Sequence, residues 1–311
     1  MSHILVTGAN GYVGGALVSE LLATTGHTLT LLDHRFDAPA PPGARQVLGS
    51  LTDHAALDEA LRDRPDTVFH LASVPGALAE REYQLGFEVN LQATLALAHR
   101  LADQGRESGR AARLVFASSV AVYGDLGSGG AHEHQPALPA LSYGAHKLMA
   151  EIALADLSRR GAIDAVSLRL PGIVARPPAE SGHGSAFMSL VMRRLAAGEP
   201  YVCPVPPHAT AWWMSLPCCV ANLLHAAAMS TAAAPASRAW QLPVLTLSVD
   251  GIVDALARRY GPRCRELVSH QPDERITALF GRMPPLHTPA ALAAGFRHDG
   301  DADQLIQAAL K

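Results

Sequence analysis

The chain has 311 residues, of which 49% are hydrophobic and 17% are charged. This composition is typical of folded globular proteins and excludes general disorder and fibrous repeats. The formal net charge is −3, and no run of Lys or Arg could follow a phosphate backbone, so we expect no nucleic-acid partner.

Short β-type runs alternate with helical patterns along the first half of the chain. The alternation predicts strands at residues 3–7, 28–33, 45–47, 67–71, 113–118 and 165–170. It predicts helices from about residue 13 to 22, 54 to 61, 80 to 103 and 143 to 160, and a loop at 125–139. Strands that alternate with helices form a parallel sheet, so we expect a Rossmann-type doubly wound α/β fold. Its ligand crevice should lie at the carboxyl ends of the strands.

The pattern becomes less regular after Arg176. Proline pairs and a Gly/Ser segment interrupt shorter helices at Pro177–Pro178, Ser181–Ser185 and Pro204–Pro207. We therefore expect a Rossmann domain at residues 1–174 and a smaller C-terminal substrate domain at 175–311. Some segments at about 214–250 should return to the Rossmann sheet.

A glycine-rich turn follows the first predicted strand. Gly8, Gly11 and Gly14 have the spacing GxxGxxG, in which the first glycine permits a tight turn and the second admits a pyrophosphate. The third glycine lets the helix pack closely on the strand, and the helix N-terminus offers N–H groups to the phosphates. The turn predicts a dinucleotide site whose cofactor contacts also include Asn10, Tyr12 and Val13.

Asp33 ends the second predicted strand, about 20 residues after the turn. A carboxylate there can bind both ribose hydroxyls and repel a 2′-phosphate, which favours NAD over NADP. Arg35 keeps NADP as an alternative cofactor, because a guanidinium can bind a 2′-phosphate.

Tyr143 and Lys147 lie four residues apart at the start of a predicted helix, in a chain whose only lysines are Lys147 and Lys311. Residues at this spacing share one helix face. A phenol has an ordinary pKa of about 10, and a neighbouring ammonium stabilises the phenolate and lowers that pKa. The same ammonium can hold ribose hydroxyls. Ser119, at the end of the fifth strand, can hydrogen-bond the substrate oxygen on which Tyr143 acts. We therefore expect Ser119, Tyr143 and Lys147 to be catalytic.

These motifs together resemble the extended short-chain dehydrogenase/reductase family, also called the NAD-dependent epimerase/dehydratase family. The resemblance also includes the strand end Phe69–Ser73, Asn90 in the following helix, and the Ser-Ser-x-x-x-Tyr-Gly segment at Ser118–Gly124. It implies a structural or relay role for Asn90 and cofactor contacts from Ser50, Leu51, Leu71, Ala72, Ser73, Asn90, Leu170, Pro171 and Ile173. Family members usually have Asp at the position of Ser50.

The second half resembles the branch of this family that acts on four-carbon sugar acids, chiefly at Val202–Pro207 and Trp212–Ser215. This resemblance implies oxidation of a C2 hydroxyl to a 2-oxo acid, with Tyr143 as general base. The expected substrate contacts are Ser73, Ser119, Tyr143, Ser185, Phe187, Trp213 and Arg176, with Arg193 as a second candidate for the substrate carboxylate. Two alternatives stay open: a nucleotide-sugar epimerase or dehydratase with tightly bound NAD, and a regulatory module that binds NAD without turnover.

The remaining features predict an ordinary intracellular enzyme. The four cysteines have neither metal-ligand spacing nor a CxxC pair, which favours reduced thiols in the cytoplasm. No basic region precedes the first apolar segment and no stretch reaches about 18 apolar residues, so we expect no signal peptide and no membrane span. His132 and His134 lack a third ligand, so we expect no metal. The family resemblance implies a homodimer through the helices at 80–103 and 143–160.

Overall fold

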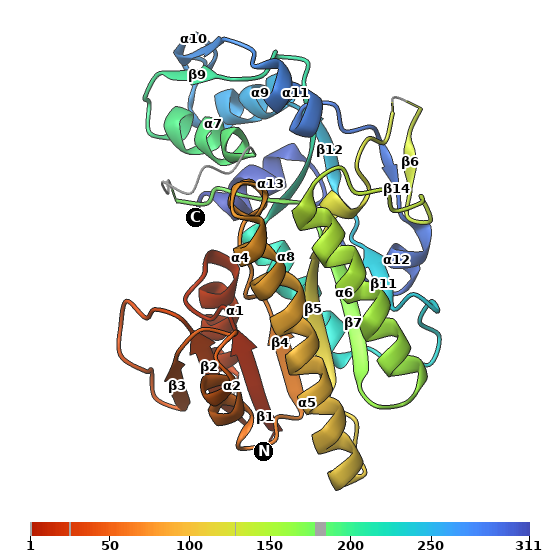
Figure 1. Ribbon diagram of the computed structural model, residues 1–311. Coiled ribbons are helices and arrows are strands. Elements are labelled where there is room, and N and C mark those ends of the chain that lie inside the picture. Colours follow the sequence, from red (N-terminus) through yellow and green to blue (C-terminus); the bar gives the residue numbers. More distant parts are fainter. Residues whose placement is uncertain (1, 25, 128, 178–184) are drawn as a thin grey trace. The chain divides into compact units, whose positions relative to one another are not determined.

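A seven-stranded sheet in the order β11-β7-β5-β4-β1-β2-β3 organises the larger part of the chain (Figure 1). Its strands are β1 (Ser2–Thr7), β2 (His27–Asp33), β3 (Ala44–Leu48), β4 (Thr67–His70), β5 (Arg113–Ser119), β7 (Asp164–Leu170) and β11 (Ala239–Gln241). The pairs β1–β2, β1–β4, β2–β3 and β4–β5 are parallel. The strand order reverses between β1 and β4, which creates the switch point where doubly wound sheets bind ligands. The Rossmann-type fold predicted from the alternation is confirmed.

The computed structural model describes residues 2–24, 26–127, 129–177 and 185–311. It divides into two units, each assembled from separate stretches of chain. Unit 1 is Met1–Val122, Pro139–Arg169 and Leu223–Trp240. Unit 2 is Tyr123–Leu138, Leu170–Asn222 and Gln241–Lys311.

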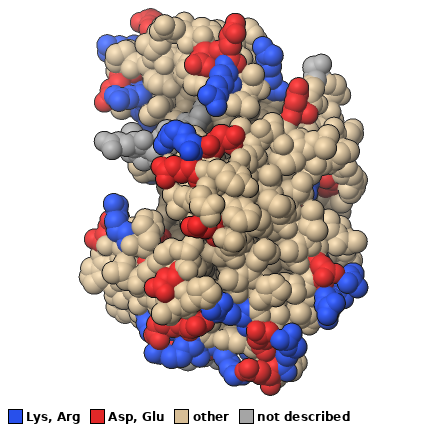
Figure 2. Space-filling view, in the orientation of Figure 1, with Lys and Arg blue, Asp and Glu red and all other residues tan. Residues whose placement is uncertain are grey.

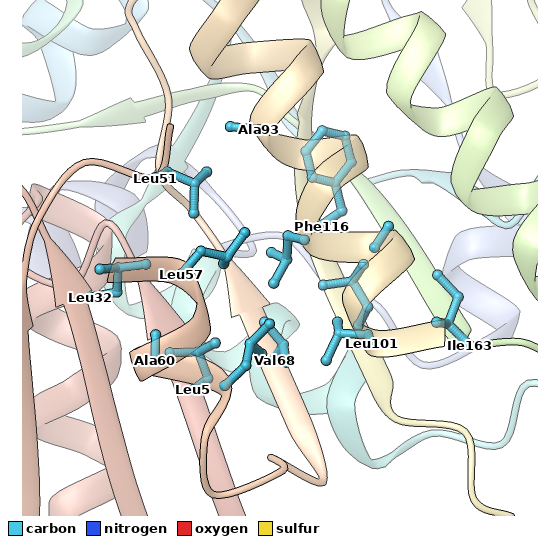
Figure 3. Close-up of a cluster of buried hydrophobic side chains, with 14 of the residues drawn as sticks. Leu5, Leu32, Leu51, Leu57, Ala60, Val68, Ala93, Leu101, Phe116 and Ile163 are labelled. Carbon is cyan, nitrogen blue, oxygen red and sulfur yellow. The ribbon is translucent and has the colours of Figure 1, made fainter. Parts of the chain in front are cut away.

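Three helices of unit 1 share one face of the sheet: α2 (His54–Leu61), α5 (Ala93–Ser108) and α6 (Ser142–Arg159). Their apolar side chains pack with those of the strands in one buried cluster, which includes Leu5, Leu57, Val68, Leu101 and Phe116 (Figure 3). Burying a large aliphatic or aromatic side chain stabilises a fold by about 1.5–3 kcal/mol. The cluster therefore fixes α6, the helix that carries Tyr143, against β5.

The prediction of one helix from residue 80 to 103 is wrong in its extent, because the structure divides this stretch into shorter helical segments. It forms α3 (Gly76–Arg81), α4 (Tyr83–Phe87), a π-helical turn η1 (Glu88–Gln92) and then α5. Glu82, with φ −118° and ψ 70°, separates the first two helices. Gly86 lies so close to Ala79 that a Cβ atom on it would be 2.8 Å from the Ala79 Cβ. Tertiary packing thus bends a stretch that reads as one helix.

The remaining elements of unit 1 connect the strands. They are α1 (Tyr12–Ala23) between β1 and β2 and the 3₁₀ turn η2 (Val120–Val122) after β5. The first part of α8 (Leu216–Ala228) belongs to unit 2 and its end to unit 1.

Unit 2 contains a three-stranded sheet in the order β12-β10-β8, made of β12 (Leu245–Ser248), β10 (Thr210–Ser215) and β8 (Gly172–Val174). The other elements are β6 (Ala131–His132), α7 (Ala186–Ala196), β9 (Tyr201–Cys203), α9 (Val249–Tyr260), α10 (Cys264–Leu267), β13 (Val268–His270), α11 (Glu274–Phe280), β14 (Leu286–His287), α12 (Pro289–Ala293) and α13 (Ala302–Ala309). The stretch predicted to be a loop at 125–139 includes β6, which pairs with β14. Among the described helices, none has both the length and the apolarity needed to cross a membrane.

Candidate active site

The glycine turn between β1 and α1 has the geometry that a dinucleotide needs. Gly8 has φ +71°, and a Cβ atom on it would lie 2.7 Å from the Ala72 nitrogen. A Cβ atom on Gly14 would lie 2.0 Å from the Gly8 carbonyl oxygen, whereas one on Gly11 would be 3.1 Å from that oxygen. Gly8 and Gly14 are therefore required by the fold itself. Gly11 keeps the backbone open to a phosphate, and the turn fits the cofactor that the motif implies.

The end of β2 is tied to this turn through Asp33. One carboxylate oxygen accepts the backbone N–H of Asn10 at 2.9 Å, and the other accepts that of Arg35 at 3.4 Å. The Arg35 guanidinium pairs with Asp37 at 3.0 Å, and the Asn10 side chain also donates to Asp37 at 3.1 Å. Hydrogen bonds from Asn10 and Arg35 lower the pKa of Asp37. The turn is therefore edged by two carboxylates, and Arg35 is engaged with one of them.

Tyr143 and Lys147 lie on the first turns of α6, and Ser119 is the last residue of β5. The Lys147 Nζ atom lies 5.7 Å from the centre of the Tyr143 ring. The Ser119 hydroxyl oxygen accepts the Ala121 N–H at 3.1 Å, which leaves its proton to donate to another acceptor. The predicted catalytic residues thus all lie in unit 1, at the carboxyl end of β5 and on the helix packed against it.

Two contacts fix the start of α6. A Cβ atom on Gly144 would lie 2.1 Å from the Ala121 carbonyl oxygen, so glycine lets the helix approach the end of β5. The Glu80 carboxylate on α3 accepts the Ser142 N–H at 2.9 Å and satisfies one of the helix's unpaired donors. A Cβ atom on Gly76, at the start of α3, would be in ordinary contact with the Tyr143 ring, at 3.6 Å. Helix α3 therefore orients the tyrosine from one side.

Lys147 is buried, with 1% of its surface exposed. Its Nζ atom lies 4.6 Å from the centre of the Phe116 ring. Burial lowers the pKa of Lys147 to about 7, and the Glu151 carboxylate opposes this shift. Contact with ring faces leaves the three N–H groups of the ammonium able to donate hydrogen bonds, and ribose hydroxyls are suitable acceptors. The surroundings of Lys147 therefore fit a bound dinucleotide.

A chain of hydrogen bonds runs through His70 behind the ends of β1 and β4. Thr94 Oγ1 donates to the Asn90 carbonyl, so it accepts from His70 Nε2 at 2.8 Å. His70 Nδ1 then accepts from Thr7 Oγ1 at 2.7 Å, and Thr7 Oγ1 accepts the Ala72 N–H at 3.4 Å. This direction assigns a neutral tautomer to His70. Burial, with a smaller effect from Lys147, lowers the pKa of His70 to about 3.

Asn90 lies in the π-helical turn and is fully buried. Its side-chain oxygen accepts the Val74 N–H at 2.7 Å and the Ser73 hydroxyl at 3.1 Å, and its amide donates to the Val74 carbonyl at 3.0 Å. A π turn adds a residue to the helix and redirects side chains, often at functional sites. Here the side chain of Asn90 holds the segment after β4 in place.

The other predicted cofactor residues lie in several places. Leu71 and Ala72 donate backbone N–H groups to the carbonyl and hydroxyl of Thr7, and Leu51 is buried. Ser50 is exposed and bonds Thr52. Leu170, Pro171 and Ile173 belong to unit 2, where Ile173 pairs with Met214 across β8 and β10.

The remaining predicted substrate residues also belong to unit 2. Phe187 and Trp213 are core residues, 2% and 0% exposed, and the Trp213 indole donates to the Leu247 carbonyl at 2.9 Å. Ser185 precedes α7 and is half-buried, and the Arg176 N–H donates to the Ser189 hydroxyl at 3.2 Å. Arg193 donates to the Ala175 carbonyl at 2.8 Å. Their contact with a substrate stays a prediction.

Sequence reasoning missed a buried ion pair beside the site. Arg169 on β7 donates to both carboxylate oxygens of Glu151 on α6, at 3.0 and 2.7 Å, and the Ser118 hydroxyl donates to the same carboxylate. A signal was available, because Glu151 follows Lys147 by four residues and so shares its helix face. His70, Glu80 and Gly144 were missed as well, since their roles depend on partners distant in sequence.

Within the described ranges, no three His, Cys, Asp or Glu side chains gather in a way that could hold a metal ion. Cys203, Cys218, Cys219 and Cys264 are free thiols. Burial raises the pKa of Cys218 to about 12 and that of Cys219 still further. These thiols are therefore poor nucleophiles.

Comparison with known proteins gives one consistent family. The NAD dependent epimerase/dehydratase family matches residues 4–213. D-erythronate dehydrogenase from Cupriavidus necator is 34% identical over 323 residues, with 98% of this chain and 97% of that protein covered. D-erythronate dehydrogenase from Haemophilus influenzae is 30% identical over 311 residues, with the same two coverages of 98% and 97%.

Among solved structures, the nucleoside-diphosphate-sugar epimerase from Agrobacterium tumefaciens is similar over 98% of this chain and 92% of its own. The TM-score is 0.91 and the sequence identity is 29%.

Proposed function

The chain belongs to the NAD dependent epimerase/dehydratase family, as its motifs predict, and on this premise we propose that it is an NAD-dependent dehydrogenase of a small sugar acid. The reaction is oxidation of the C2 hydroxyl to a 2-oxo acid, and D-erythronate is the first candidate substrate. One observation carries the proposal: two relatives named D-erythronate dehydrogenase match 98% of the chain at 34% and 30% identity. The similarity therefore includes unit 2, where the substrate residues are expected.

The chain's own residues supply the acid–base part of this chemistry. Tyr143 removes the proton of the C2 hydroxyl, and Ser119 donates a hydrogen bond to the same oxygen and orients it. The Lys147 ammonium, 5.7 Å from the Tyr143 ring, stabilises the phenolate and holds ribose hydroxyls. NAD, when bound, supplies the acceptor for the hydride that leaves C2.

The cofactor would be held by the turn and the strand ends of unit 1. Gly8, Asn10, Gly11, Tyr12, Val13 and Gly14 would face its phosphates, with Asp33, Ser50 and Leu51 towards its adenosine. Leu71, Ala72, Ser73 and Asn90 would lie towards its nicotinamide. The family resemblance also implies cofactor contacts from Leu170, Pro171 and Ile173. Arg176 is the first candidate for the substrate carboxylate, since a guanidinium can bind a carboxylate through two hydrogen bonds.

Preference for NAD over NADP is supported by charge. Asp33 and Asp37 edge the turn, and Arg35 is engaged with Asp37 at 3.0 Å, so a 2′-phosphate would meet negative charge. Asp33→Asn removes one charge and keeps an acceptor for the Asn10 N–H. We expect this variant to raise kcat/KM with NADP relative to NAD by roughly tenfold, about 1.4 kcal/mol. Steady-state kinetics with both cofactors measure the ratio, and an unchanged ratio contradicts the assignment.

The test of the function is a panel of four-carbon sugar acids and UDP-sugars with NAD, followed at 340 nm. We expect the wild type to form NADH with D-erythronate and Tyr143→Phe to form none. Circular dichroism should show that the variant is folded. UDP-sugar interconversion without NADH release, and no signal with any sugar acid, would favour a second candidate function. That candidate is a nucleotide-sugar epimerase or dehydratase, and similarity to the Agrobacterium epimerase supports it.

The setting of the enzyme is part of the same proposal. We infer a homodimeric enzyme of carbohydrate metabolism that works in the cytoplasm. Its four free thiols are typical of a reducing compartment.

A further inference from the structure

A buried ion pair in unit 1 has no role in the chemistry proposed so far. Glu151 is 3% exposed and Arg169 is 9% exposed. Arg169 donates to both oxygens of Glu151, at 3.0 and 2.7 Å, and Ser118 donates to one of them. Burying two charges costs free energy that their attraction only partly repays, and apolar residues of similar volume are often as stable. Stability alone is therefore a weak reason for this pair.

The position of Glu151 links it to the site. It follows Lys147 by one turn of α6, so the two side chains lie on the same helix face. Ser118, which holds the carboxylate from β5, directly precedes Ser119. The carboxylate thus joins α6, β5 and β7 beside Tyr143 and Lys147.

The groups around Lys147 differ in charge. Phe116 and Tyr143 present ring faces to its Nζ atom. His70 on β4 is neutral, because burial holds its pKa at about 3. Glu151 opposes the effect of burial on the pKa of Lys147, while the Arg169 guanidinium is bound to the carboxylate from β7. Among the described residues, Glu151 therefore supplies the negative charge that acts on Lys147.

We propose that Glu151 is a positioning residue whose buried carboxylate, fixed by Arg169 and Ser118, favours the ammonium form of Lys147 beside Tyr143. The catalytic part of this inference rests on the proposed dehydrogenase function. The state of Lys147 itself does not, because it can be measured without turnover.

The lysine content of the chain makes the measurement direct. With only Lys147 and Lys311 present, protein grown on ε-¹³C-lysine gives two lysine signals, and Lys311→Arg assigns them. We expect Glu151→Gln to lower the pKa of Lys147 by about one unit, as for the loss of a neighbouring opposite charge. The alkaline limb of NADH binding, followed by fluorescence, should move to lower pH by the same amount.

A second variant covers the case in which Glu151→Gln does not fold because it removes the carboxylate that Arg169 binds. Glu151→Met combined with Arg169→Met removes both charges and keeps the volume, so folding is expected to survive, and the pKa of Lys147 should again lie below that of the wild type. Asp156→Asn is the matched control, because it makes the same chemical change on an exposed position of α6 and should leave Lys147 unchanged.

The inference is overturned if Lys147 titrates at the wild-type pH in the folded Glu151 variant, single or double. It is equally overturned if Asp156→Asn shifts the titration as much. Failure of the proposed function gives a different pattern, in which the lysine titration and NADH binding shift as expected while no sugar acid is oxidised.

Discussion

The ammonium of Lys147 lies buried beside the rings of Phe116 and Tyr143, in surroundings that distinguish lysine from arginine. Arginine supplies 23 of the 25 basic residues, because Lys147 and Lys311 are the only lysines. A solvated positive charge can be either residue. A compact ammonium that fits between a phenol and a ribose cannot be replaced by a planar guanidinium, which is larger and stays charged when buried.

Lys147→Arg should therefore lose far more activity than its retained charge suggests. We expect kcat/KM to fall by at least roughly 100-fold, about 2.7 kcal/mol of transition-state stabilisation. Steady-state kinetics measure the loss, and Lys311→Arg, which makes the same change on an exposed position, is the control. A variant within a few-fold of the wild type would contradict a role for the ammonium shape.

His70 predicts an acid-sensitive fold. Its pKa is about 3 in the folded protein, against about 6.5 in an unfolded chain. The neutral form therefore stabilises the fold above about pH 6.5, and this contribution is lost as the pH falls towards 3. By about pH 5 the loss amounts to roughly 2 kcal/mol, at about 1.4 kcal/mol per pKa unit.

The test is His70→Gln, which keeps hydrogen-bonding groups but does not titrate. We expect it to be less stable than the wild type near pH 8 and to show a flatter fall in unfolding free energy towards pH 5 in urea denaturation. His146 is also buried, and burial also lowers its pKa. The contribution of His70 is therefore the difference in unfolding free energy between the variant and the wild type at each pH. Parallel curves would refute the assignment to His70.

At the scale of one element, helix α1 has two adjacent glycines, of which only the first lies too close to other backbone atoms to be replaced by alanine. A Cβ atom on Gly14 would lie 2.0 Å from the Gly8 carbonyl oxygen, whereas one on Gly15 would have 3.9 Å to the Ala9 carbonyl. Gly14→Ala should therefore destabilise the protein by at least about 3 kcal/mol, through overpacking against backbone.

Gly15→Ala should be neutral or stabilising by up to about 1 kcal/mol, because alanine favours helix. Thermal unfolding of the two variants, with NADH binding measured alongside, separates them. Equal effects at both positions would mean that the close approach of α1 to the turn is not what requires Gly14.

At the scale of the whole molecule, the outer face of α4 and α6 predicts self-association. Tyr83, Met149 and Ile152 expose 54%, 42% and 63% of their surfaces, and Figure 2 shows few charged side chains over the middle of α5 and α6. Homodimers commonly pair such a patch with its own copy around a two-fold axis.

Ile152→Arg should convert a dimer into a monomer of 32.7 kDa, because a pair of unmatched charges would be buried at the axis. Light scattering after size-exclusion chromatography measures the mass. Leu48→Arg, at a leucine 70% exposed on β3, is the control and should leave the dimer intact. A monomeric wild type would refute the dimer itself.

The sequence by itself determined the parts of this protein that depend on local pattern. Alternating strands and helices predict the doubly wound sheet, and the glycine spacing with Asp33 predicts the dinucleotide turn. The Tyr143–Lys147 spacing places a phenol and an ammonium on one helix face. Each of these rests on residues within one or two elements, whose periodicity and turn chemistry are readable in the chain.

Only the tertiary structure decided what surrounds those residues. It divided the stretch at 76–108 into several helices, because Gly86 packs on Ala79 and the π turn directs Asn90 to Val74. It also joined Glu151 to Arg169, 18 residues apart, and His70 to Thr7, 63 residues apart. Burial and long-range pairing set the charge state of a side chain, and neither has a local signature in the sequence.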